Sequence, residues 1–506
     1  MKHIKHKELR MDASILFMTT MLFISCYHTD AQTPLSRQFY FNQNNGTNVV
    51  LRENNAGTPI MAYRKTTPPS GLHFVYGDWY TGAAESFSIL DYVTPDQTSY
   101  SYQISDMRVV GNMCYFCGKC IMQQTIVGPE SDMITSIIDS TGILGRFPLS
   151  PSGFQGQAKY NLIVLDGTKS LKRMAAYCNS DGDTLIAMTG VADVAGLPSC
   201  ITVARILNTS ATWKYNVWYK GDSEIFTDIT SSYKSIVIAS RRTYVSEENL
   251  FHLRYADRFD LLQDNYSSFD TRFQFSPGTL FPTTNGFSFV RPANADVHIC
   301  SLPWKNYVYV AYCGTSNNTI GYPTALCQVG IPSMEMSDMQ VVKNCYYDPH
   351  SLIDICYQYH TYYDESSSTV ALLHRADDPY KTAVEYPKTF VSTYLGSSLI
   401  QIQQLQDNLM QSLSIYNGNN IRLGGVWSPN SSNLTHLQET IPPFVMSKNL
   451  CMNNSVGEVE YSNKTQGSIG EQDILYRKYI NMKDLIWGDK SSVSTQGVDG
   501  VVTCNH

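Results

Sequence analysis

Acidic side chains recur in this sequence about every sixty residues, each inside an apolar, strand-like segment. The recurring position holds an aspartate in four copies and another polar residue in two: Asp106, Asp228, Asp296, Asp354, Arg173 and Gln401. Two carboxylates about 5 to 10 Å apart could hydrolyse a glycosidic bond. However, equivalent residues of successive copies would form a ring of like groups, whereas an active site combines unlike ones. We therefore expect these aspartates to accept backbone hydrogen bonds, and the sequence predicts no catalytic residue.

Three of the thirteen cysteines form a CxxCxxC run, a spacing that can also hold a metal ion or an iron–sulfur cluster. Side chains alternate along a strand, so Cys114 and Cys120 should face one way and Cys117 the other. No second CxxC or HxxxH completes a ligand shell. We expect core packing or a disulfide here, and neither a metal nor another cofactor. A disulfide could also join cysteines on neighbouring strands further along: Cys300, Cys313 and Cys327.

Two other features resemble metal-binding or catalytic sites. The oxygen-rich segment 179–184 resembles a calcium loop or the Asp-box turn of sialidases, but it lacks the complete motif of either, so we expect a hairpin turn. His252 and His298 lie in strand-like segments and are interpreted as structural histidines. The sequence contains no HExxH motif, nucleophile elbow or glycine-rich loop opening a helix.

The elements that carry these residues are apolar strands. In each repeat the strand after the polar position is apolar nearly throughout, which is typical of a strand covered on both faces; the segments are 114–118, 185–188, 235–238, 307–310 and 370–373. Short polar turns precede them and indicate antiparallel neighbours. A third apolar segment carries a recurring Arg or Gln: Arg146, Arg205, Arg254 and Gln328.

Three such strands and a less regular fourth, within about sixty residues, match one blade of a β-propeller. The sequence therefore predicts an all-β fold, a β-propeller with seven blades of four antiparallel strands. Six repeats are visible between about residues 100 and 428. The segments 49–61 and 459–476 would supply a seventh sheet built from both ends. Residues 32–506 would form one domain, with a loop-rich part at about 430–506.

The segments 104–107, 110–118 and 142–147 resemble those of exported β-propeller proteins of anaerobic bacteria. The resemblance covers most of the chain after residue 31, and its motifs are structural. It implies a fold and an exported location. It implies no activity, because such families often have no assigned function.

The first 31 residues read as an export signal, with Lys2, Lys5, Lys7 and Arg10 before the short apolar run 13–25. Cleavage before Gln32 is the favoured route, and a lipobox ending at Cys26, where a lipid would attach, is the alternative. No later segment is apolar enough for a membrane helix. The product would be periplasmic, anchored to the outer membrane or extracellular. With 37 basic against 44 acidic residues, nucleic acid is not expected as a partner.

We expect a binding or scaffolding module of the bacterial cell envelope that takes a glycan or protein ligand. The alternative is a carbohydrate-active propeller enzyme, either a glycoside hydrolase or a lyase, and a third possibility is a passive envelope or adhesion component. Loops vary more than strands between repeats, so ligand contacts are expected from loops on one face. Tryptophans can stack on sugars or pack between blades. Trp79 and Trp304 are the candidate ligand-binding residues. The sequence leaves the oligomeric state open.

Overall fold

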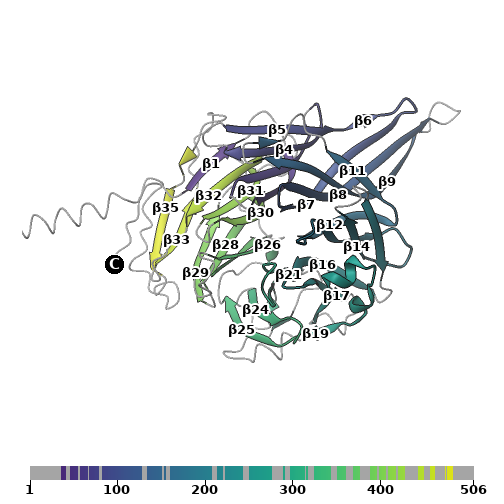
Figure 1. The fold of residues 1–506 in the computed structure, drawn as a ribbon. Helices are drawn as coiled ribbons and strands as arrows, with labels where there is room; N and C mark the ends of the chain where they lie inside the picture. The colour runs from purple at the N-terminus through teal and green to yellow at the C-terminus, as the bar shows by residue number, and fades with distance from the viewer. Residues whose placement is uncertain are drawn as a thin grey trace, which may run out of the picture.

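The computed structural model describes residues between 36 and 481, and Figure 1 shows their arrangement. The gaps within that span are 41–45, 55–56, 67, 79–82, 128–133, 151–152, 155–159, 208–212, 220–222, 243–249, 276–288, 291–296, 314, 317–323, 343–349, 360–367, 377–387, 396–397, 406–407, 417–419, 428–442, 450–455, 462–472 and 475. Outside these gaps the chain is all-β, with one short helix, α2 (Arg258–Leu262), and one 3-10 turn, η2 (Ser267–Asp270).

Within the described part of the chain, seven antiparallel sheets contain four or more strands. The first comprises β2 (Gly46–Glu53), β3 (Pro59–Lys65), β4 (Gly71–Asp78) and β5 (Ala83–Leu90). The second comprises β6 (Tyr92–Val93), β7 (Thr98–Val110), β8 (Met113–Val127), β9 (Ile134–Ser150), β10 (Gly153–Phe154) and β11 (Asn161–Leu165). The third comprises β12 (Thr168–Cys178), β13 (Thr184–Ala192), β14 (Cys200–Ile206) and β15 (Trp213–Tyr219). The fourth comprises β16 (Glu224–Ser231), β17 (Ser235–Arg242), β18 (Phe251–Asp257) and β19 (Phe273–Phe275).

The fifth sheet comprises β21 (Val297–Cys300), β22 (Tyr307–Cys313), β24 (Thr324–Gly330) and β25 (Met336–Val342). The sixth comprises β26 (His350–Tyr359), β27 (Ser368–Ala376), β28 (Lys388–Leu395) and β29 (Ser398–Leu405). The seventh comprises β30 (Asn408–Tyr416), β31 (Asn420–Trp427), β32 (Pro443–Asn449), β1 (Ser36–Tyr40) and β34 (Asp473–Ile474). Two further pairs are β20 (Phe289–Val290) with β23 (Thr315–Ser316), and β33 (Val456–Tyr461) with β35 (Tyr476–Asn481).

One strand of each large sheet lies next to a common axis (Figure 1). These inner strands contact one another in a closed cycle, in the order β2, β7, β12, β16, β21, β26, β30 and back to β2. In the seventh sheet the N-terminal strand β1 pairs with β32, so segments from both ends of the chain share one sheet. The arrangement is propeller-like.

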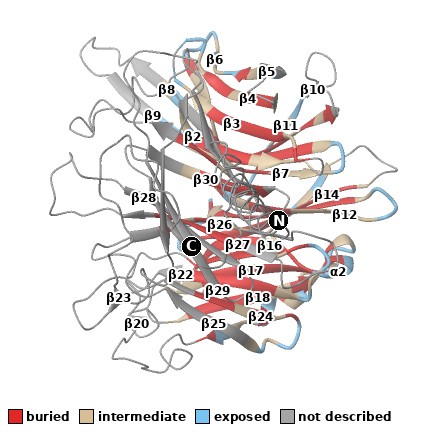
Figure 2. Cartoon of the chain, turned by 90° about the vertical axis from the view of Figure 1, so that its left-hand side faces the viewer, coloured by how far each residue is buried: buried red, intermediate tan, exposed pale blue. Residues whose placement is uncertain are grey.

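The hydrophobic core lies between successive sheets, and Figure 2 shows the buried residues concentrated in the strands. Separate clusters join the first sheet to the second, the second to the third, and so on to the sixth. Strand β8 shows why its sequence is continuously apolar: Cys114 and Cys120 pack toward the first sheet, while Cys117 packs toward the third. The predicted alternation of these cysteines is therefore confirmed.

Three details differ from the sequence interpretation. Residues 49–61 belong to a complete sheet of their own rather than to a shared one. Gln401 lies on β29, the outer strand of the sixth sheet, so it is not a ring position. Part of the expected loop-rich segment forms β32. Asp296, Trp79, Cys26 and the whole export signal lie outside the described residues.

Candidate functional site

The inner strands share an irregularity next to the polar positions. Five of them have a shift in register with their partner strand immediately before the polar residue, namely at Asp106, Arg173, Asp228, Asp354 and Ser412. A bulge of this kind bends the strand and re-aims the following side chain. The repeated bulge thus accounts for the polar side chain that approaches the axis on each of these five strands.

These side chains form a set that we call the charge ring. In the order of the inner strands it comprises Arg52, Asp106, Arg173, Asp228, His298, Asp354 and Ser412. Basic and acidic members alternate, so each aspartate has a basic group on at least one side. An odd-numbered ring cannot alternate throughout, and the neutral Ser412 occupies the remaining place, between Asp354 and Arg52.

Each described aspartate of the ring joins its own sheet to the next through backbone hydrogen bonds. Asp106 accepts from the N–H groups of Met107 at 2.8 Å and of Met174, on the next inner strand, at 3.0 Å. Asp228 accepts in the same way from Ile229 and Ile299. The predicted backbone hydrogen bonds are therefore present at these aspartates.

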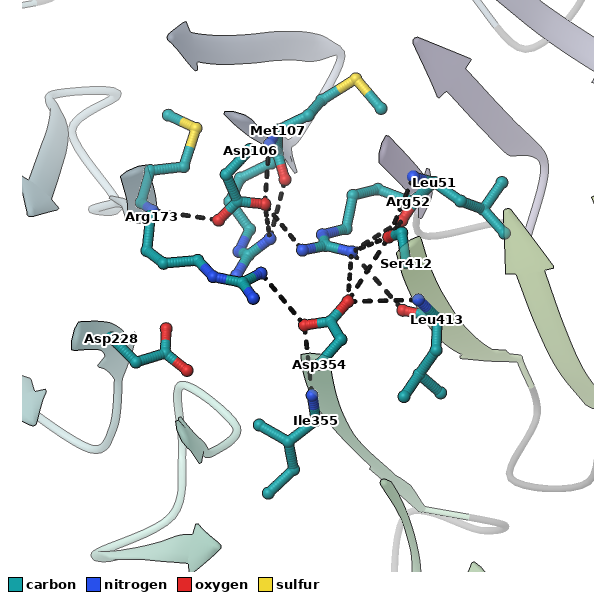
Figure 3. A network of polar contacts seen from close by, with 12 residues as sticks. Leu51, Arg52, Asp106, Met107, Arg173, Asp228, Asp354, Ile355, Ser412 and Leu413 are labelled. Atoms are coloured by element: carbon teal, nitrogen blue, oxygen red, sulfur yellow. Dashed lines mark hydrogen bonds and ion pairs between the residues drawn. The ribbon is translucent and has the colours of Figure 1, made fainter. Parts of the chain in front are cut away.

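Asp354 repeats the pattern, accepting from Ile355 and Leu413, each at 3.1 Å. It also forms ion pairs with both ring arginines, with Arg52 at 3.3 Å and with Arg173 at 3.2 Å (Figure 3). Because Asp354 lies on the sixth inner strand and Arg173 on the third, this ion pair crosses the axis. Such contacts fix the inner strands relative to one another.

Asp106, like Asp354, forms ion pairs with two arginines. Its Oδ1 accepts from Arg52 at 2.6 Å and from Arg108 at 2.7 Å, and its side chain is fully buried. The remaining acid, Asp228, lies 3.2 Å from Nδ1 of the buried His298. All three acids thus contact basic side chains and accept hydrogen bonds from backbone groups.

The pKa values follow from these contacts. Burial alone would raise the pKa of Asp354, but Arg52 and Arg173 outweigh it and lower the pKa to about 2. Burial also opposes ionisation of Asp228, yet the hydrogen bond from His298 and the charge of Arg173 keep its pKa below the usual value. Glycoside hydrolysis needs an acid of raised pKa to protonate the leaving group. Neither Asp354 nor Asp228 meets that requirement.

Glu53, next to Arg52 in sequence, has the opposite behaviour. Burial raises its pKa to about 7, against the lowering effect of Arg422, which lies 3.1 Å away. This carboxyl is only 7% exposed and is not among the described residues that line the cavity below. Its raised pKa is therefore explained by burial and does not indicate a general acid.

A cavity of about 420 Å³ opens beside the charge ring. Its described lining is mostly polar and comes from strands of five sheets: Asn48, Val49, Val50, Arg52, Gln103, Ile104, Ser105, Lys119, Ser170, Leu171, Lys172, Arg173, Ile353, Gln411 and Ser412. Four of these residues are basic. None is an acid, a histidine, a tyrosine or a cysteine. The described lining is carried by strands, and the expectation that loops supply the ligand contacts stays a prediction.

The tryptophans separate into two groups. Trp213 packs against Tyr115 of the second sheet and lies under Arg146, and Trp218 packs against Phe226 of the fourth sheet. These two pack between sheets. Trp304 is half-exposed in the connection between β21 and β22, and the described lining of the cavity does not include it. Its assignment to ligand binding stays a prediction, as does that of Trp79.

The remaining sequence candidates are a turn, a buried histidine and unpaired cysteines, and none of them forms a binding site in the described residues. In segment 179–184 the Asn179 side chain accepts from the N–H groups of Asp181 and Asp183, which makes it the predicted hairpin turn between β12 and β13. His252 is buried on β18. The cysteines whose side chains are described carry no disulfide, so the bridge considered between Cys300 and Cys327 is absent. In the described part of the chain no group of His, Cys, Asp and Glu is arranged to hold a metal ion.

Sequence reasoning missed the ring members Arg52 and Ser412 and the cavity residues Lys119 and Lys172. It singled out His298 as a structural histidine but placed Asp296, rather than His298, at the recurring position of that repeat. One signal was available, because Asp106, Arg173 and Asp228 already alternate in charge along the chain. Extending that alternation would have suggested a basic residue in the first and fifth sheets. The lysines carry no comparable repeat signal.

No protein-family profile matches the chain, and no curated protein matches it by sequence. Among solved structures, it is similar to a protein of unknown function from Dyadobacter fermentans, with 10% identity, a TM-score of 0.37, and coverage of 82% of this chain and 100% of that one. It is also similar to an ulvan lyase, with 8% identity, a TM-score of 0.44, and coverage of 80% and 95%.

A further similar structure is a Trypanosoma rangeli sialidase in complex with the inhibitor DANA, with 8% identity and a TM-score of 0.39. The match covers 82% of this chain but only 58% of the longer sialidase. Identities this low assign no activity to this chain. In the part of the chain that the structure describes, no helix is long and apolar enough to span a membrane.

Proposed function

We propose that this chain is an exported, seven-bladed β-propeller that binds a ligand beside its charge ring without transforming it. The blade count is supported by the closed cycle of seven inner strands among the described residues. Export is supported by the signal-like residues 1–31, with cleavage before Gln32 or lipid attachment at Cys26 as the two routes. Residues 32–506 would then form one domain at or outside the cell envelope.

The observation that carries the binding function is the contrast between the ring and the cavity. The ring acids already accept ion pairs and backbone hydrogen bonds, so they are occupied in holding the sheets together. The adjoining cavity is lined by amides, hydroxyls and basic groups, which can hydrogen-bond a ligand. A recess of about 420 Å³ is of the size that takes a small molecule or one end of a glycan, rather than a flat protein surface.

The alternative is a carbohydrate-active enzyme. The described lining provides no carboxylate pair for hydrolysis. A lyase needs a base to remove a proton, and the lining amines Lys119 and Lys172 are the described cavity groups able to act in that way. Binding without turnover is favoured because neither lysine has a described neighbour that would orient it as a base.

A glycan array probed with the exported protein tests the proposal, followed by product analysis on each glycan that is retained. The expected result is retention of a small group of related glycans that are recovered unchanged. A variant with Ser105→Trp, which fills the cavity from β7, should lose retention while keeping its melting temperature. Formation of products by the wild type and not by the variant would replace the binding function with the enzyme alternative.

A further inference from the structure

The charges around the cavity are not balanced. At its floor, Arg52 and Arg173 are paired with Asp106 and Asp354, so these four buried groups compensate one another. The remaining basic residues of the lining are Lys119 and Lys172, and no described acid lies within ion-pair distance of either. Among the described residues, the cavity therefore carries uncompensated positive charge, although the chain as a whole has a formal net charge of -7.

The arginines at the floor are already bonded to the protein through their terminal nitrogens. Nη1 of Arg52 donates to the Leu51 and Leu413 carbonyls and to Ser412, and Nη2 donates to Asp106. Both terminal nitrogens of Arg173 are likewise engaged, one with Asp354 and one with the Ile353 carbonyl. Each guanidinium has five N–H donors, so these bonds orient the arginines without using every donor. The lysine ammonium groups, which present three donors each on a flexible stem, are the basic groups of the lining with no described acid as a partner.

The cavity wall has a fixed backbone. Lys119 on β8 lies opposite Gln103 and Gly142 in register. A Cβ at Gly118 would lie 1.9 Å from the Gln103 carbonyl oxygen, and one at Gly142 would lie 2.2 Å from Oγ1 of Thr168. Glycines therefore permit the close approach of the strands on either side of Lys119. The wall is formed before any ligand binds, which lowers the entropy cost of binding.

The neutral part of the lining suits hydroxyl groups. Asn48, Gln103 and Gln411 provide amides, and Ser105 and Ser170 provide hydroxyls. Gln411 already accepts from the Val49 N–H at 2.6 Å, which leaves its amide NH₂ to donate. The described lining contains no aromatic ring, so recognition here would depend on hydrogen bonds and charge rather than on stacking.

Building on the binding function proposed above, we propose that the cavity takes a small polyhydroxylated acid. Its carboxylate, sulfate or phosphate group lies against Lys119 and Lys172, and its hydroxyl groups contact the amides and serines. The two uncompensated ammonium groups select the acid over its neutral counterpart. Charge-assisted hydrogen bonds to an anion are about twice as strong as neutral ones, which makes this selection effective.

Isothermal titration calorimetry with matched hexoses tests this inference. The probes are D-glucuronate, glucose 6-sulfate and glucose 6-phosphate, with D-glucose as the neutral reference. At least one acid should bind about tenfold or more tightly than D-glucose, because one charge-assisted hydrogen bond corresponds to about a tenfold change. The acid that binds best identifies the anionic group, and its affinity should fall as salt is added.

The variants Lys119→Gln and Lys172→Gln should each weaken that acid about tenfold and leave D-glucose unchanged. Lys214→Gln, on the outer strand β15 of the third sheet, is the matched control and should change nothing. Circular dichroism should show the wild-type spectrum for all three variants.

Equal affinity for the acids and D-glucose, or unchanged acid binding in both lysine variants, would overturn the selection of acids while leaving a binding cavity in place. Absence of binding by every acid would also overturn this inference. The broader binding function would fail separately, if the glycan array retained nothing or if retained glycans were converted to products.

Discussion

Replacing Asp354 by Asn removes the charge that both ring arginines share. The pKa of Asp354 lies near 2 instead of the usual 3.8, a difference that corresponds to about 2 kcal/mol of folding free energy at neutral pH. The asparagine keeps one acceptor oxygen, so one of the N–H groups of Ile355 and Leu413 also loses its partner, at a cost of about 1 kcal/mol. The hydrogen bond from Leu413 already contributes to the low pKa, so the two figures overlap and the expected loss is about 2 to 3 kcal/mol, near the lower end of values for broken buried ion pairs.

The effect should depend on pH in a defined direction. Folding lowers the pKa of Asp354, so its contribution is complete above the usual value of 3.8 and is lost as pH falls through about 2. The difference between wild type and Asp354→Asn should therefore be nearly constant from pH 7 down to about 5 and about 1 kcal/mol smaller at pH 3.

Urea unfolding followed by circular dichroism at pH 7 and pH 3 measures both quantities. Asp193→Asn is the matched control, because Asp193 is half-exposed and its pair with Lys169 at 3.6 Å should contribute less than about 1 kcal/mol. A loss at Asp354 no larger than the loss at Asp193, or a difference that grows at pH 3, would refute the structural role of this carboxylate.

Three further predictions concern the ring, the cavity wall and the cysteines. Ser412→Ala removes the acceptor of the Leu51 N–H at 3.1 Å and should lower the free energy of unfolding in urea by about 1 to 3 kcal/mol. Equal stability of the variant and the wild type would show that this hydrogen bond does not stabilise the fold. Gly118→Ala places a methyl group against the Gln103 carbonyl and should lower stability by about 1 to 3 kcal/mol; a neutral effect would show that the wall is not closely packed. In thiol labelling of the folded protein, Cys178→Ser should remove one fast-reacting group and Cys117→Ser none, because Cys178 is exposed and burial raises the pKa of Cys117 well above its usual range. Loss of a fast-reacting group in the Cys117 variant would contradict the burial of that thiol.

The all-β class and the propeller-like arrangement follow from local patterns and could be predicted. Strand β8 is apolar at successive positions because Cys114 and Phe116 pack on one neighbouring sheet while Tyr115 and Cys117 pack on the other. That pattern can be read from successive residues of one strand, without knowledge of distant parts of the chain. The same holds for the aspartates, whose backbone hydrogen bonds recur at equivalent positions of the repeat.

The closure of the ring and the cavity could not be predicted in the same way. Arg173 and Asp354 are 181 positions apart in sequence, and only the closed cycle of sheets brings them together. The repeat spacing predicts Gln401 at the recurring polar position, but its strand β29 lies at the outer edge of the sheet. The cavity depends on Lys119 and Lys172 from two different sheets, and no sequence spacing relates them.

The most direct test of binding without catalysis is mass spectrometry of an acidic oligosaccharide incubated with the wild-type protein at stoichiometric concentration. The oligosaccharide should be one that the protein retains. Binding beside an inert charge ring predicts that its mass is unchanged after prolonged incubation and that Lys172→Gln releases it intact. Fragments that form with the wild type and are absent with folded Lys172→Gln would show that the cavity is an active site and would contradict the account.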